Sequence, residues 1–316
     1  MKTYNRTTVK VIGVGGSGCN TLNYIGQQQL RQVHLVACDF HKPDLENSTM
    51  EDRFYLERSE VGVSHGTGDP EIGRKAALKR ADAINTMLLE GSPEIVFIVA
   101  GMGGGAGTGA APEIARLAKE LGILTIGVVT APGHSEGDRK AAVAEAGIAA
   151  MRQHTDTTVV LANDKVRQLY GELPRADVFV KLDEYVAHAV RAIAEIVAVT
   201  AELNVDVDDV RTVMAGARRA TVGSGTGAGQ GRAMLAAQQA VATALLGSEL
   251  QGSDRVLLSI ISGPETELEM DELTEITEFI QNSTSEQVEV IFGHAIDDDL
   301  GDQLRVTFIA SSFSEN

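Results

Sequence analysis

A nine-residue stretch, Gly101 to Gly109, contains the residue types best suited to holding a phosphate chain. Six of its nine residues are glycines, so the backbone can approach a ligand closely and direct several N–H groups toward it. An apolar run at 95–100, which predicts a buried strand, precedes it, and residues 110–121 follow with helical spacing. That helix would add the positive end of its dipole. A simple turn needs only one or two glycines, so the pattern favours a phosphate-binding loop.

A second glycine-rich turn, Gly13-Val14-Gly15-Gly16-Ser17-Gly18, follows the predicted strand at 9–14. Alone it matches the G-x-G-x-x-G of a dinucleotide-binding turn, with Asp39 placed to bind the ribose of NAD. This stretch alone is therefore compatible with an NAD-binding domain. Because ligands of open α/β folds bind at the carboxyl ends of the strands, two such turns favour a nucleoside triphosphate held from two sides. The sequence has no G-x-x-x-x-G-K-[ST], which excludes a P-loop NTPase.

The segments that position these turns alternate between strand and helix patterns, which is typical of an α/β fold with a doubly wound parallel sheet. Residues 42–69 look irregular, with one short helix, and 62–70 looks like a flexible loop. Strands are expected at 9–14, 33–38, 95–100, 124–130 and 157–162, and helices at 70–89, 110–121 and 136–152.

The second half of the chain predicts a long helix and a smaller α/β domain. The helix, at 176–203, has apolar residues on more than one face, as expected for a helix between two domains. An acidic loop, Asn204 to Asp209, comes next, and helix capping is the ordinary explanation for its aspartates. A glycine-rich linker is expected at 223–231. Helices at 232–246 and 269–282 and strands at 255–262, 288–296 and 304–311 follow.

Composition and charge exclude several classes of protein. The 316 residues suggest about two domains, and 43% hydrophobic and 22% charged residues are ordinary for a soluble globular protein. A net charge of −17 argues against non-specific binding to nucleic acid or to an anionic membrane. Two cysteines offer no disulfide framework, which fits a reducing cytosol. Without a signal peptide or an 18-residue apolar run, neither export nor membrane insertion is expected, and the location predicted is cytoplasmic.

The order of the motifs resembles the tubulin/FtsZ family, and FtsZ more closely than eukaryotic tubulin, over almost the whole chain. The fold implied is a GTP-binding domain at 1–175, a central connecting helix at 176–203 and a C-terminal domain at 204–316 that begins with the catalytic loop. The segments that carry the resemblance are Val11 to Gly16 with Asn20, Gly101 to Pro112, Ala118 to Thr125, Asn163 to Lys165, Phe179 with Asp183, Asn204 to Met214, Ile291 to Gly293 and Arg305 to Thr307.

The resemblance implies a GTPase that binds GTP and GDP, with Mg²⁺ or a monovalent cation beside the nucleotide. Glu136 would reach the ribose, near Arg139 and Lys140, which stand around the position of the family's usual arginine. A carboxylate accepts the N1–H and N2–H groups of guanine, and adenine has no N1–H, so GTP is favoured over ATP. The phosphate-binding residues implied are Gly15, Gly16, Ser17, Gly103, Gly104, Gly105, Ala106, Gly107, Thr108 and Gly109; those implied for guanine are Asn20, Asn163, Asp183 and, packed on its face, Phe179.

The family also implies head-to-tail polymerisation into protofilaments, with cell division as the cellular task. Asp206 and Asp209, with Asn204, would enter the nucleotide pocket of the adjacent subunit and polarise the attacking water. Hydrolysis would then depend on assembly through one repeated heterologous contact. Other partners implied are division or membrane-adaptor proteins, at the division site. The sequence lacks the family's usual C-terminal linker and adaptor-binding peptide, so it is either truncated or a divergent member with another attachment, and we favour the divergent member.

Departures from the family pattern cluster around the nucleotide. Ala106 stands where the family usually has Thr, Ala37-Cys38-Asp39 replaces Asn-Thr-Asp, and 131–135 lacks the usual Arg and Phe residues. These changes keep open a scaffold that binds GTP and polymerises but hydrolyses it poorly, or one with a role outside division. An NAD-dependent oxidoreductase is a third class, but the second half offers no hydride-transfer site. The seven histidines show no metal spacing, and no metal site is expected; His65 and His134 lie in loops that could flank the nucleotide.

Overall fold

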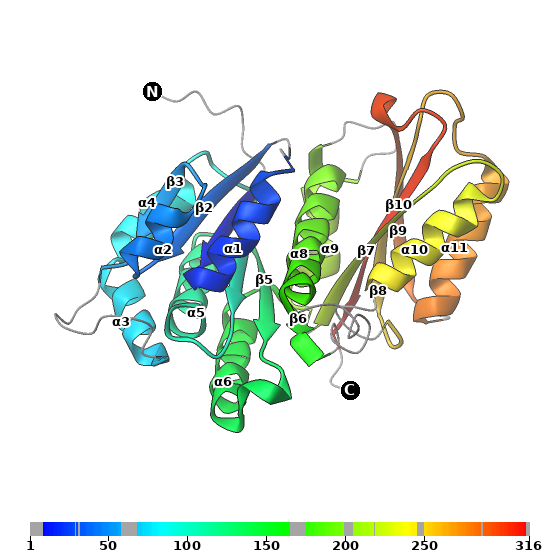
Figure 1. Ribbon diagram of the computed structural model, residues 1–316. Coiled ribbons are helices and arrows are strands. Elements are labelled where there is room, and N and C mark those ends of the chain that lie inside the picture. Colours follow the sequence, from blue (N-terminus) through cyan, green and yellow to red (C-terminus); the bar gives the residue numbers. More distant parts are fainter. Residues whose placement is uncertain are drawn as a thin grey trace. The chain divides into compact units, whose positions relative to one another are not determined.

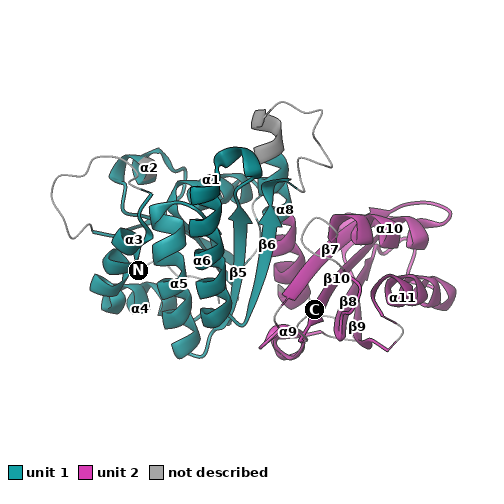
Figure 2. Ribbon diagram, turned by 90° about the horizontal axis from the view of Figure 1, so that it is seen from below, with its two compact units in different colours: residues 1–187 teal, residues 188–316 magenta. Residues whose placement is uncertain are grey.

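The computed structural model describes residues 9–28, 30, 32–57, 68–164, 175–198, 205–217, 219–244, 250–285 and 287–313. It divides into two compact units, residues 1–187 and 188–316 (Figure 2). The division falls within helix α8 (Arg175–Ala198), which contributes residues to both units. The long helix predicted at 176–203 is thus present, although its last residues lie outside the described part of the chain.

Unit 1 is built on a six-stranded, wholly parallel sheet in the order β3-β2-β1-β4-β5-β6 (Figure 1). Strands are added toward one edge of the sheet from β1 to β3 and toward the other edge from β4 to β6. Because crossovers between parallel strands are right-handed, this reversal of strand order places helices on both faces, which confirms the doubly wound fold. The strands are β1 (Val9–Val14), β2 (Val33–Asp39), β3 (Asp52–Tyr55), β4 (Ile95–Gly101), β5 (Leu124–Ala131) and β6 (Thr157–Ala162).

The helices of unit 1 differ from the sequence predictions mainly at their boundaries. The helix predicted at 70–89 is two helices that meet at Arg80, and strand β3 lies in the stretch that looked irregular. β3 has only four residues, of which alternate ones are half-buried, so its pattern was too short to recognise. The helices are α1 (Gly15–Gly26), α2 (Lys42–Asn47), α3 (Pro70–Lys79), α4 (Ala81–Leu89), α5 (Gly105–Glu120), α6 (Asp138–His154) and the short η1 (His134–Glu136).

Helix α5 starts five residues earlier than predicted, so Gly105 to Gly109 are helical and not part of a loop. These glycines allow the backbones of α3 and α5 to touch. A Cβ on Gly109 would lie 1.8 Å from the carbonyl oxygen of Pro70, and one on Gly73 would lie 2.3 Å from that of Gly105. Part of the glycine content that suggested a ligand therefore serves helix packing.

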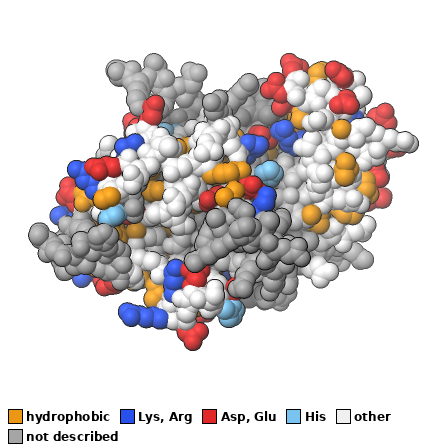
Figure 3. All heavy atoms as spheres, in the orientation of Figure 1, with side chains coloured by type: hydrophobic (Ala, Val, Ile, Leu, Met, Phe, Trp, Pro, Cys, Tyr) orange, Lys and Arg blue, Asp and Glu red, His pale blue; other side chains and the backbone are white. Residues whose placement is uncertain are grey.

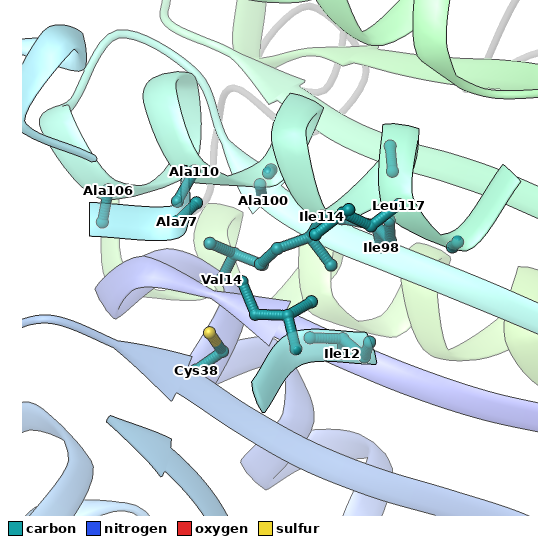
Figure 4. Close-up of a cluster of buried hydrophobic side chains, with 14 of the residues drawn as sticks. Ile12, Val14, Cys38, Ala77, Ile98, Ala100, Ala106, Ala110, Ile114 and Leu117 are labelled. Carbon is teal, nitrogen blue, oxygen red and sulfur yellow. The ribbon is translucent and has the colours of Figure 1, made fainter. Parts of the chain in front are cut away.

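A core cluster fills the space between α5 and the central strands. Figure 4 shows Ala106, Ala110, Ile114 and Leu117 of α5 beside Ile12 and Val14 of β1 and Ile98 and Ala100 of β4. All eight side chains are buried, and each contributes the free energy of removing its apolar surface from water. This packing fixes the start of α5 against the ends of β1 and β4.

Unit 2 contains a mixed four-stranded sheet in the order β7-β10-β8-β9, in which only β8 and β9 are parallel. Helices α10 and α11 pack on it through a second buried cluster. The strands are β7 (Arg219–Gly227), β8 (Arg255–Ser262), β9 (Glu289–Ile296) and β10 (Leu304–Ser312); the helices are α9 (Val207–Met214), α10 (Arg232–Ala244), α11 (Met270–Thr284) and the short η2 (Asp298–Leu300).

The prediction of a glycine-rich linker at 223–231 is wrong, because most of it is strand β7. Gly223, Gly225 and Gly227 alternate along the strand and face α10, whose backbone lies directly on them. A Cβ on Gly223 or Gly225 would lie 2.2 Å from a helix carbonyl oxygen, and one on Gly227 would lie 2.1 Å away. Only Gly229 and Gly231, with φ of 70° and 75°, belong to a turn.

Neither a membrane-spanning helix nor a metal-binding cluster is found in the part of the chain that the structure describes. No helix in it is both long enough and apolar enough to cross a membrane. It also contains no cluster of three or more His, Cys, Asp or Glu residues arranged to hold a metal ion. In the acidic turn at 297–302, which is partly exposed, the Asp297 carboxylate accepts a hydrogen bond from the N–H of Asp299 at 3.1 Å.

Candidate nucleotide-binding site

The two glycine turns lie side by side at one edge of the sheet of unit 1. β1 and β4 are parallel neighbours, with Val14 opposite Ala100, so the two strands end at the same edge of the sheet. A Cβ on Gly101 would lie 2.7 Å from Cβ of Ser17, and one on Gly15 would lie 3.2 Å from the backbone nitrogen of Gly107. The sequence prediction that the two turns share an edge is confirmed. This edge is where open α/β folds bind their ligands.

Both turns lead directly into helices whose first N–H groups have no side-chain cap in the described structure. Neither α1 nor α5 carries an acidic residue in its first turn. In contrast, Asp69 caps α3 and Asp206 caps α9. Two uncapped helix N-termini at one edge present unpaired N–H donors and two positive dipole ends, which together favour an anion.

Gly104 is the N-cap of α5, and neither packing nor backbone strain explains why it is a glycine. Its φ of −106° is accessible to any residue. A Cβ at this position would meet no atom within 4 Å. In contrast, its neighbour at position 103 must be a glycine, because its φ is +100° and an added Cβ would lie 2.7 Å from Cγ of Lys140. Gly104 therefore faces open space at the N-terminus of α5, and we refer to this space as the cradle.

Two side chains of the glycine turn face inward and shape it. The hydroxyl oxygen of Thr108 accepts a hydrogen bond from the N–H of Gly103 at 2.8 Å, which closes the turn onto the first helical residues. Ala106 belongs to the buried core, and a Cβ on Gly15 would lie 3.1 Å from its methyl group (Figure 4). Ser17 and Asn20 of α1 are exposed, and Gly16 is half-buried.

A polar cluster lies beside the glycine turn, centred on Glu136. One carboxylate oxygen of Glu136 accepts hydrogen bonds from the N–H of Gly133 at 3.0 Å and from Nδ2 of Asn163 at 3.2 Å. The other accepts from Nζ of Lys140 at 2.6 Å. Partial burial raises the pKa of Glu136, but these hydrogen bonds outweigh it and lower the pKa overall. Glu136 is therefore an anion held in place by Lys140, whose side chain lies next to Gly103; Arg139 is exposed.

Asp164 was missed as a site residue by the sequence reasoning. Its carboxylate accepts the N–H of His134 at 2.9 Å and also pairs with the His134 ring nitrogen Nδ1. A Cβ on Gly133 would lie 2.6 Å from Oδ1 of Asp164, so a glycine is needed for this approach. The hydrogen bond to Asp164 raises the pKa of His134. Residues 133–136 are thus attached to Asn163 and Asp164 at the end of β6.

A second polar group connects α1 with α8 inside unit 1. The hydroxyl of buried Thr21 donates to Oδ1 of Asp183 at 2.5 Å. Burial raises the pKa of Asp183, and the hydrogen bond from Thr21 only partly offsets this. Thr21 was not predicted from the sequence, because its partner lies 162 residues further along the chain. It places Asp183 next to the α1 turn that carries Asn20.

The buried side-chain oxygen Oδ1 of Asn163 has no hydrogen-bond partner in the described structure. An unpaired buried acceptor costs free energy, so it indicates a missing donor. A nucleobase that carries N–H groups would supply one. Asn163 and Asp183 thus both offer acceptor oxygens; their role in base binding stays a prediction.

Some predicted residues fall elsewhere or outside the described structure. Asn204 lies outside it, and Phe179 lies in α8 with a side chain that is not described. Asp206 caps α9, with Oδ1 accepting from the N–H groups of Asp208 at 2.8 Å and Asp209 at 3.1 Å, while Asp209 accepts the N–H of Asp206 at 3.0 Å. Asp39, the candidate ribose ligand of an NAD domain, is 2% exposed and accepts the N–H groups of Phe40 and His41.

Unit 1 thus has the topology and the site of a doubly wound nucleotide-binding protein. Comparison with protein families agrees. Residues 8–171 match the GTPase domain of the Tubulin/FtsZ family, and residues 218–314 match the C-terminal domain of the FtsZ family. The chain belongs to the Tubulin/FtsZ family and carries its GTPase domain. The NAD-dependent alternative is therefore rejected.

Solved structures of similar fold include FtsZ and CetZ proteins. An FtsZ dimer from M. jannaschii, in the empty state, is 29% identical, with a TM-score of 0.83 over 98% of this chain and 89% of that one. CetZ2 from Haloferax volcanii, a GTPγS-bound protofilament, is 20% identical, with a TM-score of 0.80 over 98% and 94%. CetZ1 from the same organism, a GDP-bound monomer, is 22% identical, with a TM-score of 0.80 over 98% and 95%. The CetZ matches support the fold alone.

Proposed function

We propose that the protein binds GTP at the edge formed by the two glycine turns and hydrolyses it in a head-to-tail filament of its own subunits. The observation that carries the binding proposal is Gly104, where a glycine faces open space at an uncapped helix N-terminus. The phosphates would accept hydrogen bonds from the N–H groups at the starts of α1 and α5. A Mg²⁺ or monovalent cation beside the phosphates would offset part of their negative charge.

The polar clusters supply ribose and base recognition in this proposal. Glu136 is kept anionic and oriented by Lys140, Gly133 and Asn163, so it can accept a hydrogen bond from a ribose hydroxyl. Asp183, with Asn20 and Asn163, would accept the N1–H and N2–H groups of guanine. Because adenine offers no N1–H, ATP would leave the half-buried Asp183 carboxylate with only its hydrogen bond from Thr21, and this gives the preference for GTP.

The catalytic carboxylates of the proposal are Asp206 and Asp209 at the start of α9. Their hydrogen bonds to backbone N–H groups orient them, and each carboxylate has further lone pairs for a water molecule. They would act on the nucleotide of the next subunit in a filament. The FtsZ structure that is 29% identical to this chain is a dimer, which supports assembly of subunits of this chain with one another. Positioning of water by such carboxylates is a major part of catalysis in phosphoryl transfer.

The two roles of Asp206, helix cap and catalyst, can be separated by substitution. Asp206→Asn keeps a good N-cap but removes the charge, whereas Asp206→Ala removes both. We expect both variants to lose at least about 100-fold in turnover, as for loss of a positioned base, and to bind GTP normally. Only Asp206→Ala should lower the thermal unfolding midpoint. Wild-type turnover in Asp206→Asn would leave Asp206 as a helix cap only.

The dependence of turnover on assembly is tested by phosphate release and pelleting across a range of protein concentrations, with GTP, GDP and ATP. Release that rises only above a critical concentration, and only with GTP, supports the shared site. Assembly without release would instead favour a scaffold that binds GTP but hydrolyses it poorly. That alternative has one observation in its favour, the replacement of the family's usual Thr by the buried Ala106.

The cellular task we propose is cell division, with division or membrane-adaptor proteins as further partners at a cytoplasmic division site. The match of residues 218–314 to the FtsZ C-terminal domain supports it. A fluorescent fusion should form a ring at the constriction site, and depletion should give undivided cells. Normal division with altered cell shape would place the protein in another cytoskeletal role.

A further inference from the structure

Helix α9 is short, and its position determines where Asp206 and Asp209 stand. It has eight residues, too few for an isolated helix to be stable, so contacts with the rest of unit 2 must hold it. Val210, Val213 and Met214 are buried, and the helix packs against β8 and β10. Apolar contacts of this kind are not directional. They stabilise the helix without fixing its position along its own axis.

A directional contact is found at the C-terminal end of α9. The guanidinium of Arg255, at the start of β8, donates through Nη1 to the carbonyl oxygen of Thr212 at 2.7 Å. Carbonyl groups in the last turn of a helix have no partner within the helix, and a cation is favoured there by the dipole. Arg255 therefore holds one end of α9 while Asp206 and Asp209 cap the other.

The same guanidinium contacts two further segments of unit 2. Its Nε lies 3.2 Å from a carboxylate oxygen of Glu289, the first residue of β9. Its Cζ lies 4.8 Å from the ring centroid of Phe313, in a cation–π contact. Phe313 follows β10 directly and is itself held, because its N–H donates to the carboxylate of Asp254 at 2.7 Å. Arg255 thus joins α9 to β9 and to the chain leaving β10.

Cations are scarce in this part of the chain, which makes their placement informative. Residues 188–316 contain seven arginines and no lysine, against 21 Asp and Glu residues. Acidic side chains gather at the end of unit 2 near the loops before α11 and β10 (Figure 3), where Glu265, Glu267 and Asp302 are exposed. Carboxylates are thus the most abundant partners for an arginine in unit 2. Arg255 nevertheless uses one of its donors to bind a backbone carbonyl group of α9.

We propose that Arg255 is a positioning residue for GTP hydrolysis. It holds α9, and with it Asp206 and Asp209, in the place from which they reach the neighbouring nucleotide, and stacking on Phe313 holds the guanidinium in turn. The proposal rests on the catalytic role proposed above for the two carboxylates. It also makes turnover sensitive to the chain segment that leaves β10, because displacing Phe313 would release one side of Arg255.

The test compares Arg255→Ala and Arg255→Lys with the wild-type chain, under conditions where all remain folded by circular dichroism. A lysine keeps the charge but cannot donate to Thr212 and Glu289 while stacking on Phe313. We expect kcat to fall by about tenfold to 100-fold in Arg255→Ala, as expected for a misplacement of about 1 Å, and less in Arg255→Lys. GTP affinity should stay unchanged. Phe313→Ala should lower kcat a few-fold, whereas Phe313→Tyr, which keeps an aromatic ring, should have the wild-type kcat.

Two controls separate positioning from general destabilisation. Arg305→Ala also removes an ion pair of unit 2, with Glu195 at 3.0 Å. Arg305 forms no hydrogen bond or ion pair with α9 among the described residues, so this variant should keep the wild-type kcat. In an Asp206→Asn background, Arg255→Ala should cost nothing more, because the group it positions is already inactive. Wild-type kcat in Arg255→Ala, or a full additional loss in the double variant, would overturn the proposal. If Asp206→Asn itself keeps its turnover, the proposed catalytic role fails first.

Discussion

Two glycine-rich stretches of this chain look alike in sequence and serve opposite purposes. In the turn that contains Gly103 and Gly104, one glycine is required by φ and the next faces open space. In β7, Gly223, Gly225 and Gly227 face the backbone of α10, and no space remains. Glycine content alone therefore does not distinguish a ligand site from close packing. What distinguishes them is whether the missing side chain leaves room at a strand end beside a helix N-terminus.

The largest effect that would sharpen this comparison is expected in β7. Gly225→Ala places a methyl group 2.2 Å from the carbonyl oxygen of Ala236, so α10 must move away from the sheet. We expect the free energy of unfolding of unit 2 to fall by about 3 kcal/mol, as for an overpacked core. Urea denaturation measures this loss, and GDP affinity of the folded protein should be unchanged. An unfolding free energy equal to that of the wild type would show that the contact is not tight.

The same methyl group added at Gly104 should have the opposite consequences. Gly104→Ala meets no protein atom within 4 Å but projects into the proposed phosphate cradle. We expect GTP affinity to fall about tenfold, equivalent to about 1.4 kcal/mol, by isothermal calorimetry. Stability should change by less than about 1 kcal/mol, since Ala is only a poorer N-cap than Gly. Wild-type GTP affinity in this variant would remove the main support for the cradle.

The smallest expected effect concerns the loop beside the glycine turn and depends on pH. Asp164 raises the pKa of His134, so the imidazolium–Asp164 pair is complete below the ordinary histidine pKa and is lost as pH rises through the raised value. That pair attaches the segment 133–136 to Asp164, and within this segment the N–H of Gly133 orients Glu136. We expect wild-type GDP affinity to exceed that of His134→Gln by about two- to threefold at pH 6, with the ratio approaching one at pH 8.5.

Calorimetry of the two proteins in the same buffers measures this ratio, and the titration of the nucleotide itself cancels between them. A ratio that stays constant with pH would show that protonation of His134 does not tighten the loop.

The comparison also shows how far the sequence predicts this molecule. The central strands were predicted well, because β4 and β5 are continuous apolar runs that remain apolar on both buried faces. The positions of the glycine turns followed from the strand ends. The nature of β7 did not, because a strand with glycine at alternate positions lacks the apolar pattern by which strands are recognised. Its fit depends on Ala236 and Ala240 of a helix formed later in the chain.

The site residues divide in the same way. Glu136, Lys140 and Asn163 were predicted by resemblance, and the structure brings these three together. Thr21 and Asp164 were not predicted, because their roles arise only from contacts with Asp183 and His134 across the fold. The catalytic assignment of Asp206 and Asp209 remains a proposal, since the same geometry also caps a helix.

The most direct test of the account mixes two inactive variants. Gly104→Asp would repel the phosphates but keeps Asp206, and Asp206→Asn binds GTP but lacks the carboxylate. In a mixed filament, the intact Asp206 of one subunit would meet the GTP of its neighbour. We expect an equal mixture to recover turnover, up to about a quarter of the wild-type rate if the subunits assemble at random through one heterologous contact. Co-pelleting of the two variants with turnover no higher than the sum of the separate rates would contradict it.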